Sequence, residues 1–208
     1  MTKEKSKIII KKLKQYYGKI GTELSFSGIY ELAISVVLSA QTTDRQVNSV
    51  TPALFRKYPG FKNLSHASIH DVESIIKSVG LYKTKAKNII NLSKEVVNKY
   101  NNILPDVFNE LIKLPGIGRK SANVILSMGY KKAAFAVDTH ILRVANRIGY
   151  IKTSDPFKVE KALMHYIPRR DWIKVHLIII KHGRNLCSAR KPLCSGCPVK
   201  ELCDFANI

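Results

Sequence analysis

The chain has 208 residues, enough to bury a core as one large domain or as two small ones. Its 35 lysines and arginines against 15 acidic residues give a formal charge of +20, which indicates a polyanionic partner unless it only reflects a lysine-rich proteome. The sequence has no apolar run of about 18 residues, no signal peptide and no long amphipathic helix with one basic face. We therefore expect a cytosolic protein that neither spans nor coats a membrane.

Hydrophobic residues recur at spacings of three and four rather than two, which predicts an all-α chain of about ten helices. Thr43 with Gln46, and Ser68 with Asp71, have the spacing of residues that open helices. Gly183 is expected to end the last helix. The predicted helices cover residues 7–17, 30–40, 43–57, 68–79, 84–100, 107–113, 121–128, 138–148, 154–167 and 171–182.

The stretch Leu114–Ala122, with the sequence LPGIGRKSA, separates two short amphipathic segments. Pro115 cannot continue a helix, and Gly116 and Gly118 can adopt positive φ and leave their backbone uncovered. We expect a helix, a tight turn and a second helix, whose N–H groups and partial positive charge suit a DNA phosphate. Lys120 lies in the first turn of the second helix, where the dipole disfavours the ammonium form, and a neutral amine can be a nucleophile.

A similar turn precedes the predicted helix at residues 84–100. Residues 79–86, with the sequence VGLYKTKA, also combine a helical-hairpin turn with a basic helix start. This segment is either a second phosphate site or an ordinary helical hairpin, and the sequence favours neither.

All four cysteines lie near the C-terminal end, and Cys187, Cys194, Cys197 and Cys203 form the pattern C-x6-C-x2-C-x5-C. Disulfides are not expected in a cytosolic chain, and clustered cysteines of this kind indicate a metal site. Structural zinc sites usually pair two short C-x2–4-C hooks, whereas this chain has one such hook with wider gaps on either side. Four thiolates also hold a [4Fe–4S] cluster, so the spacing favours iron–sulfur while leaving zinc as the alternative.

Three basic residues accompany the cysteines. Arg184 precedes the first cysteine, and Arg190 and Lys191 lie between the first and the second. A loop held at both ends by metal ligands presents its side chains rigidly and can bind phosphates. The alternative is an ordinary solvated loop, since charged side chains are common on surfaces.

Asp138 lies where a helix is expected to begin, and it has two compatible interpretations. Its side chain suits an N-cap. A carboxylate fixed in that way can also stabilise an oxocarbenium-like sugar or assist proton transfer beside a lysine nucleophile. His140, at the same helix start, is interpreted as a packing residue.

Together these motifs resemble those of the helix–hairpin–helix base-excision DNA glycosylases, most closely the endonuclease III branch. The resemblance extends over about residues 7–203 and rests on the hairpin, the aspartate and the cysteine spacing occurring together. It implies that the metal is a [4Fe–4S] cluster. The segments that match are residues 39–44 (SAQTTD), 114–123 (LPGIGRKSAN), 136–140 (AVDTH), 143–144 (RV), 146–147 (NR), 182–184 (HGR) and the four cysteines.

The resemblance implies an all-α, two-lobed fold with a DNA-binding cleft between the lobes. One lobe is a six-helix barrel with the hairpin, at residues 22–132, and the other is a discontinuous [4Fe–4S] cluster domain, at residues 1–21 and 133–208. Lys120 and Asp138 would face each other across the cleft. Gln41 would fill the gap left by an extruded nucleotide, and Leu81 would wedge the opposite strand; the alternatives are an ordinary loop amide and an ordinary packing residue. The implied phosphate contacts are Gly116, Gly118, Arg119, Arg184, Arg190 and Lys191.

The implied activity is that of a DNA N-glycosylase with lyase activity at abasic sites, working as a monomer on double-stranded DNA with damaged bases or abasic sites. Such an enzyme removes oxidised pyrimidines and cleaves the strand by β-elimination through a lysine Schiff base. A cytoplasmic, nucleoid-associated location follows. The alternatives are a monofunctional mismatch glycosylase of the same superfamily, which usually lacks a lysine matching Lys120, and a non-enzymatic DNA-binding metal module.

Overall fold

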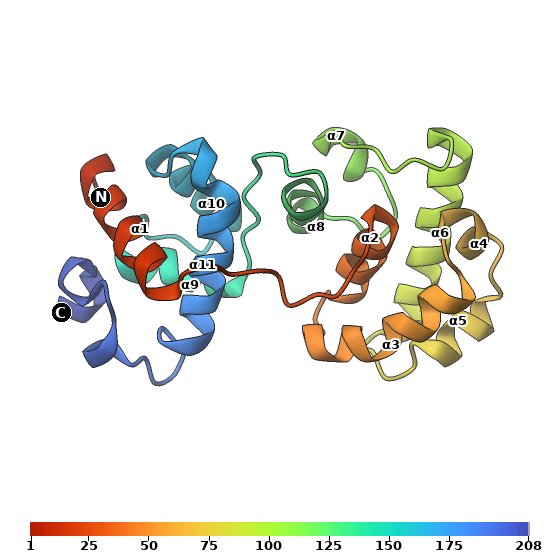
Figure 1. Cartoon of the computed structure of the whole chain (residues 1–208), viewed down its shortest axis with the longest axis horizontal. Coiled ribbons are helices and arrows are strands. Elements are labelled where there is room, and N and C mark those ends of the chain that lie inside the picture. The colour runs from red at the N-terminus through yellow and green to blue at the C-terminus, as the bar shows by residue number, and fades with distance from the viewer. Residues whose placement is uncertain (208) are drawn as a thin grey trace. The chain divides into compact units, whose positions relative to one another are not determined.

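The computed structural model of the chain describes residues 1–207, whose regular structure is entirely helical (Figure 1). This confirms the all-α prediction. The backbone divides into two compact units. We call residues 22–132 the hairpin unit, and residues 1–21 together with the chain from Ala133 onward the cysteine unit.

In the hairpin unit, α2 supplies much of the core. Its residues from Leu32 to Leu38 are all buried, as expected for a helix that is apolar nearly all round. The long helix α6 packs against α4 and α5. The helices are α2 (Ile29–Leu38), α3 (Asp44–Lys57), α4 (Phe61–Ser65), α5 (Ile69–Ile75), α6 (Tyr82–Tyr100), α7 (Phe108–Leu111) and α8 (Arg119–Val124), which continues as a π-helical turn, η1 (Ile125–Gly129).

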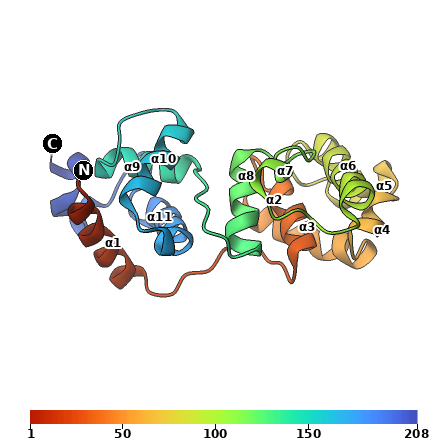
Figure 2. The ribbon, with the colours of Figure 1, turned by 90° about the horizontal axis from the view of Figure 1, so that it is seen from above.

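In the cysteine unit, α11 packs against α9 and α1 around a core that includes Ile9, Val144 and Ile179 (Figure 2). Apolar residues at helical spacing on each of these helices account for that packing. The helices are α1 (Lys3–Tyr17), α9 (Thr139–Ile148), α10 (Pro156–Tyr166) and α11 (Trp172–Asn185), with short 3-10 turns η2 (Arg169–Asp171), η3 (Cys194–Gly196), η4 (Lys200–Leu202) and η5 (Asp204–Asn207).

The prediction that Gly183 ends the last helix is wrong, because α11 continues to Asn185. Gly183 instead contributes to the packing of α11 against α9. A Cβ at this position would lie 3.0 Å from the Cβ of His140 and 3.3 Å from Cγ2 of Val144, both on α9. The glycine therefore allows α11 to approach α9 closely.

The predicted helix starts are found, although one of their side chains has a different partner. Thr43 accepts a hydrogen bond from the backbone N–H of Gln46 at 3.2 Å, as an N-cap should. Ser68 precedes α5 but makes no side-chain cap. The Asp71 carboxylate instead accepts a hydrogen bond from Lys57 Nζ at 2.5 Å, which ties α5 to the end of α3.

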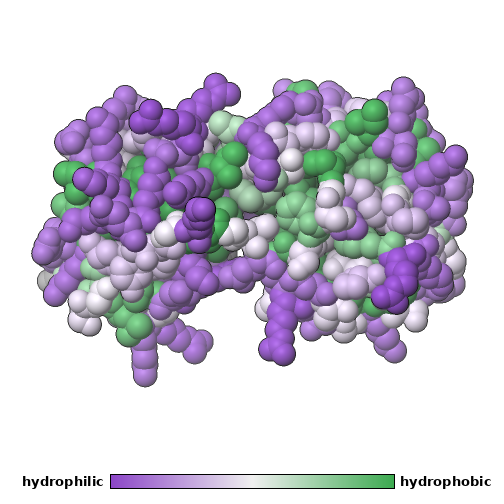
Figure 3. Space-filling model, viewed as in Figure 1, coloured by the Kyte–Doolittle hydropathy of each residue, from purple (hydrophilic) through white to green (hydrophobic). Residues whose placement is uncertain are grey.

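The visible face in Figure 3 is largely hydrophilic, with hydrophobic side chains gathered in smaller patches. This agrees with an excess of basic residues spread over both units. Among residues 1–207, no helix is both long and apolar enough to cross a lipid bilayer.

Candidate functional site

The LPGIGRKSA stretch forms the expected turn between α7 and α8. Leu114 and Ile117 are each 4% exposed and anchor the turn in the core, and Ile117 N–H donates to the Leu114 carbonyl at 3.1 Å. Gly116 has φ +78°, and a Cβ there would lie 2.9 Å from Cγ1 of Val37. The hairpin is thus held rigidly against α2, and only glycine fits at Gly116.

Gly118 has a different role, because it needs neither positive φ nor space in the core. Its backbone is extended, and a Cβ built there meets nothing within 4 Å. Gly118 caps α8 without a side-chain hydrogen bond, so the first N–H groups of α8 are not taken up by a side-chain cap. Open backbone at a helix start suits a phosphate oxygen.

Lys120 occupies the second position of α8 and is exposed. Within residues 1–207, its Nζ has no ion-pair or hydrogen-bond partner. Its neighbour Arg119 lies over the ring of Phe108, 4.9 Å from its centroid, which ties the start of α8 to α7. The arrangement leaves an accessible amine beside the open backbone of Gly118.

Asp138 is the N-cap of α9, as the sequence predicts. Its Oδ1 accepts a hydrogen bond from Ile141 N–H at 2.8 Å, and the side chain is half-buried. The cap uses one carboxylate oxygen and fixes the orientation of the group. Next along the helix, His140 Nδ1 lies 3.2 Å from a guanidinium nitrogen of Arg143, and burial lowers the pKa of His140. A neutral packing histidine agrees with the interpretation from sequence.

The four cysteines line one pocket, whose other walls include the apolar side chains Ile148, Leu186 and Val199. Burial raises the pKa values of Cys197 and Cys203, backbone hydrogen bonds partly offset this rise, and the charges of the other thiolates add to it. Gathering four thiolates in an apolar pocket is unfavourable unless a cationic centre compensates their charge. The pocket and its donor set therefore fit an iron–sulfur cluster.

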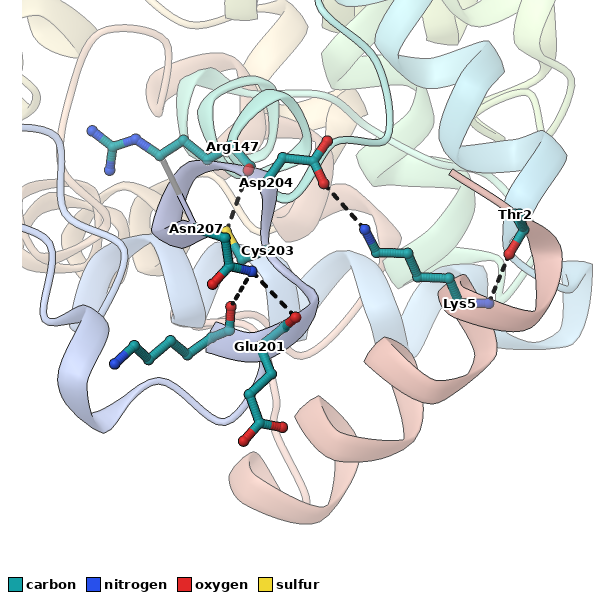
Figure 4. A network of polar contacts seen from close by, with 8 residues as sticks. Thr2, Lys5, Arg147, Glu201, Cys203, Asp204 and Asn207 are labelled. Carbon is teal, nitrogen blue, oxygen red and sulfur yellow. Dashed lines mark hydrogen bonds and ion pairs between the residues drawn. The ribbon is translucent and has the colours of Figure 1, made fainter.

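Two side chains that the sequence did not assign support this pocket. Arg147 donates to the Ser188 and Ala189 carbonyls at 2.6 and 2.8 Å, and its own carbonyl lies 3.3 Å from the Cys203 sulfur (Figure 4). His182 Nε2 lies 3.8 Å from the Cys197 sulfur, and burial lowers the pKa of His182 to about 4. Only the fold reveals these contacts, because they join α9 and α11 to residues between 15 and 56 positions further along the chain.

The loop between the first two cysteines is held by Arg147 and closed by a Leu193 N–H bond to the Leu186 carbonyl at 2.8 Å. Arg190 and Lys191 are exposed on it. Arg184 is also exposed, in the last turn of α11. Arg190 and Lys191 are thus presented on an ordered loop and Arg184 on the end of a helix; their contact with phosphates stays a prediction.

Gln41 and Leu81 lie on two loops of the hairpin unit, between α2 and α3 and between α5 and α6 (Figure 1). Both side chains are exposed. Both residues have positive φ, 53° at Gln41 and 58° at Leu81, which is uncommon for residues other than glycine. Lys120, Gly116, Gly118 and Arg119 belong to the same unit, whereas Asp138, Arg184, Arg190, Lys191 and the cysteines belong to the cysteine unit.

Two family models match the chain. The HhH-GPD superfamily of base excision DNA repair proteins matches residues 34–169, and the iron–sulfur binding domain of endonuclease III matches residues 187–203, the span of the four cysteines. The second match confirms the prediction of a [4Fe–4S] cofactor over zinc.

Curated relatives and solved structures give the same picture. The chain is 39% identical to endonuclease III of Synechocystis over 99% of this chain and 94% of the relative, and 44% identical to that of Bacillus subtilis over 87% and 83%. A trapped covalent intermediate of an endonuclease III with DNA matches with a TM-score of 0.95 and 39% identity, covering 100% of this chain and 98% of that one. A thermostable thymine-DNA glycosylase, 21% identical with a TM-score of 0.89, shares the fold.

Proposed function

This chain belongs to the HhH-GPD superfamily of base excision DNA repair proteins, and we propose that it is a bifunctional DNA glycosylase that also cleaves the strand at abasic sites. Its substrate in this proposal is double-stranded DNA with oxidised pyrimidines or abasic sites. The endonuclease III that it resembles over its full length has been captured in a covalent intermediate with DNA, which supports a nucleophilic mechanism. Because DNA is the substrate, we place the enzyme in the cytoplasm with the nucleoid.

The first step requires the damaged nucleotide to leave the base stack, at a cost of a few kcal/mol that is lowest for a damaged base. The Lys120 amine, in its neutral form, then bonds to C1′ of the deoxyribose. The glycosidic bond breaks, and the base leaves with the bonding electron pair and is protonated. Lys120 suits this role because its Nζ is exposed beside the open start of α8.

The second step breaks the strand. Loss of a proton from the nitrogen and opening of the sugar ring give a Schiff base between Lys120 and C1′. The Schiff base acidifies the hydrogen on C2′; removal of that proton expels the 3′ phosphate by β-elimination. The Asp138 carboxylate, held by its cap to Ile141, is proposed to assist base departure and to move these protons.

Binding in this proposal depends on phosphate contacts from both units. The backbone N–H groups at Gly116 and Gly118 hold phosphate oxygens, with Arg119 beside them. Arg184, Arg190 and Lys191 contribute charge-assisted contacts. The four cysteines would hold the [4Fe–4S] cluster, and their bonds to it would restrain the loop that carries Arg190 and Lys191.

The observation that carries the proposal is the exposed, unpaired Lys120 amine at the start of α8 in the helix–hairpin–helix turn. Borohydride reduction should trap the wild-type enzyme on a duplex with an abasic site as a stable covalent complex. Lys120→Ala should trap none, whereas Lys62→Ala, which removes an exposed lysine on α4, should trap as well as wild type.

Three other outcomes would contradict the proposal. Undiminished trapping by Lys120→Ala would assign the nucleophile to another amine. Excision without any trapping by the wild type would identify a monofunctional glycosylase, and DNA binding with neither reaction would identify a non-enzymatic module.

A further inference from the structure

Lys85 is buried inside the hairpin unit, although its sequence context is that of a basic helix start. Its side chain emerges from the first turn of α6, and the residue is only 4% exposed. Its Nζ donates to the Leu38 carbonyl at 2.8 Å and to Thr42 Oγ1 at 2.7 Å. The ammonium therefore points inward and does not offer a surface contact to a phosphate.

The two acceptors of Lys85 flank the loop that carries Gln41. Leu38 is the last residue of α2, where the helix dipole places partial negative charge and a cation is favoured. Thr42 follows Gln41 directly. One side chain thus holds both ends of this short loop.

Lys85 also bonds to Leu81, which lies in the loop between α5 and α6. Its backbone N–H donates to the Leu81 carbonyl at 3.0 Å, the first hydrogen bond of α6. The loops also lie close together, since a Cβ built on Gly80 would lie 3.7 Å from the Gln41 carbonyl oxygen and 3.7 Å from Thr42 Oγ1.

The backbone of Gln41 and that of Leu81 both have positive φ, a conformation that surrounding contacts must stabilise. A positive φ at a residue other than glycine costs on the order of 1–3 kcal/mol and persists where neighbouring contacts enforce it. Gln41 and Leu81 share this conformation, and Leu81 is 62% exposed, so its side chain contributes little packing. Lys85 is buried and bonds to both loops, to Thr42 through its Nζ and to Leu81 through its backbone N–H.

We infer that Lys85 is a positioning residue that locks the Gln41 and Leu81 loops into one rigid pair, so that both side chains enter the duplex together when a nucleotide is extruded. This inference rests on the proposed function. It adds that Gln41 and Leu81 act as a coupled unit and that Lys85 couples them. Lys85 itself touches no reacting atom.

The test compares two lysine variants of the full-length enzyme. Lys85→Met keeps the apolar stem and removes the donor. Lys131→Met is the matched control, because Lys131 Nζ also donates to a carbonyl at a helix end of the same unit, that of Met128 at 2.7 Å. Excision of an oxidised pyrimidine from a duplex should fall between about 10- and 100-fold in Lys85→Met, the usual effect of misplaced positioning groups, and stay at the wild-type rate in Lys131→Met.

A second substrate separates positioning from general damage to the enzyme. A single-stranded oligonucleotide with an abasic site needs no extrusion from a duplex, so borohydride trapping on it should proceed in Lys85→Met at the wild-type rate. In duplex DNA, 2-aminopurine opposite the lesion should brighten less on binding Lys85→Met than on binding wild type, because fewer bases are unstacked. An equal loss of reaction rate on the single-stranded and the duplex substrate would overturn the inference.

A double-mutant cycle tests whether Lys85 acts through Gln41 and Leu81. Gln41→Ala and Leu81→Ala should each slow duplex excision in the wild-type background and add little in the Lys85→Met background. Fully additive effects would contradict the coupling. If Lys85→Met lowers the melting temperature, Thr42→Val carries the test. It removes one of the two acceptors of Lys85, together with the hydrogen bond from Thr42 Oγ1 to the Ala40 carbonyl at 3.3 Å, and should show a weaker form of the same substrate split.

The failure of this inference is distinct from that of the proposed function. A wild-type enzyme that excises no base refutes the proposed function. A wild-type enzyme that excises normally, together with folded Lys85→Met and Thr42→Val variants that match it on duplex DNA, refutes only the role of Lys85.

Discussion

The Asp138 carboxylate accepts a hydrogen bond from Ile141 N–H at 2.8 Å, so a proposed catalytic group also starts a helix. Substitutions of Asp138 can separate its role as a helix cap from its proposed role in catalysis. Asparagine caps helices about as well as aspartate, so Asp138→Asn should keep the stability of the wild type, whereas Asp138→Ala should lose about 1 kcal/mol. Both should slow base release by at least about 100-fold, the usual contribution of a group that transfers protons.

Asp155 provides the control, because it caps α10 through Phe157 N–H at 2.8 Å and has no proposed part in the chemistry. Asp155→Ala should lower stability by a similar amount, measured by denaturant unfolding, and leave single-turnover base release unchanged. Normal base release by Asp138→Asn would leave Asp138 as a cap alone.

The two hairpin glycines should respond differently to alanine. Gly116→Ala places a Cβ against Val37 at a φ of +78°, which should cost about 2–4 kcal/mol through strain and overpacking. Gly118→Ala adds a Cβ in open space, so stability should change by less than about 0.5 kcal/mol. If phosphates approach the backbone there, Gly118→Ala should still weaken DNA binding in a titration at fixed salt. Unchanged affinity in Gly118→Ala would remove that contact.

Helix starts could be predicted from sequence because the chemistry that makes them is local. Thr43 with Gln46, and Asp138, each act within one turn, and α3 and α9 begin where these residues predict. The cysteine spacing similarly predicted a metal pocket, and the family match to residues 187–203 identified its cofactor.

Features that depend on contacts between distant helices could not be predicted. Gly183 reads as a helix stop, but it lies within α11 because α9 packs against it. Lys85 belongs to a predicted basic helix start that was either a phosphate site or an ordinary hairpin, and only the fold places the carboxyl end of α2 over its side chain. The five-residue helix α4 was also missed, since a single turn carries too little periodicity to detect.

The contact between α3 and α5 should make part of the stability dependent on pH. Hydrogen bonds from Lys57 and Tyr58 hold the pKa of the Asp71 carboxyl below its usual value. The stabilisation is therefore present above the ordinary pKa, about 3.9, and is lost as the pH falls through the lowered value. Asp71→Asn should melt below wild type at pH 7, and the difference should shrink as the pH falls below the ordinary pKa of an aspartate.

For that experiment, Glu4→Gln is a suitable control, because the Glu4–Lys7 ion pair lies on the surface of α1. Exposed pairs of this kind add little stability. The melting temperature of Glu4→Gln should follow that of wild type across the whole pH range. If the melting temperature of Asp71→Asn lies below that of wild type by the same amount at every pH, titration of the Asp71 carboxyl is excluded as the cause.

The loop between Cys187 and Cys194 should contribute to DNA affinity through charge. Arg190→Gln and Lys191→Gln each remove one exposed cation from a loop that Arg147 holds by its carbonyls, so each should flatten the slope of log affinity against log salt by about one. Lys158→Gln, on the exposed face of α10, should leave the slope unchanged. Binding is measured by fluorescence anisotropy at several salt concentrations, with the cluster band near 400 nm recorded to verify an intact loop. If the slope is unchanged in both loop variants while the band persists, the loop carries no phosphate contact, and the excess charge must act elsewhere on the protein.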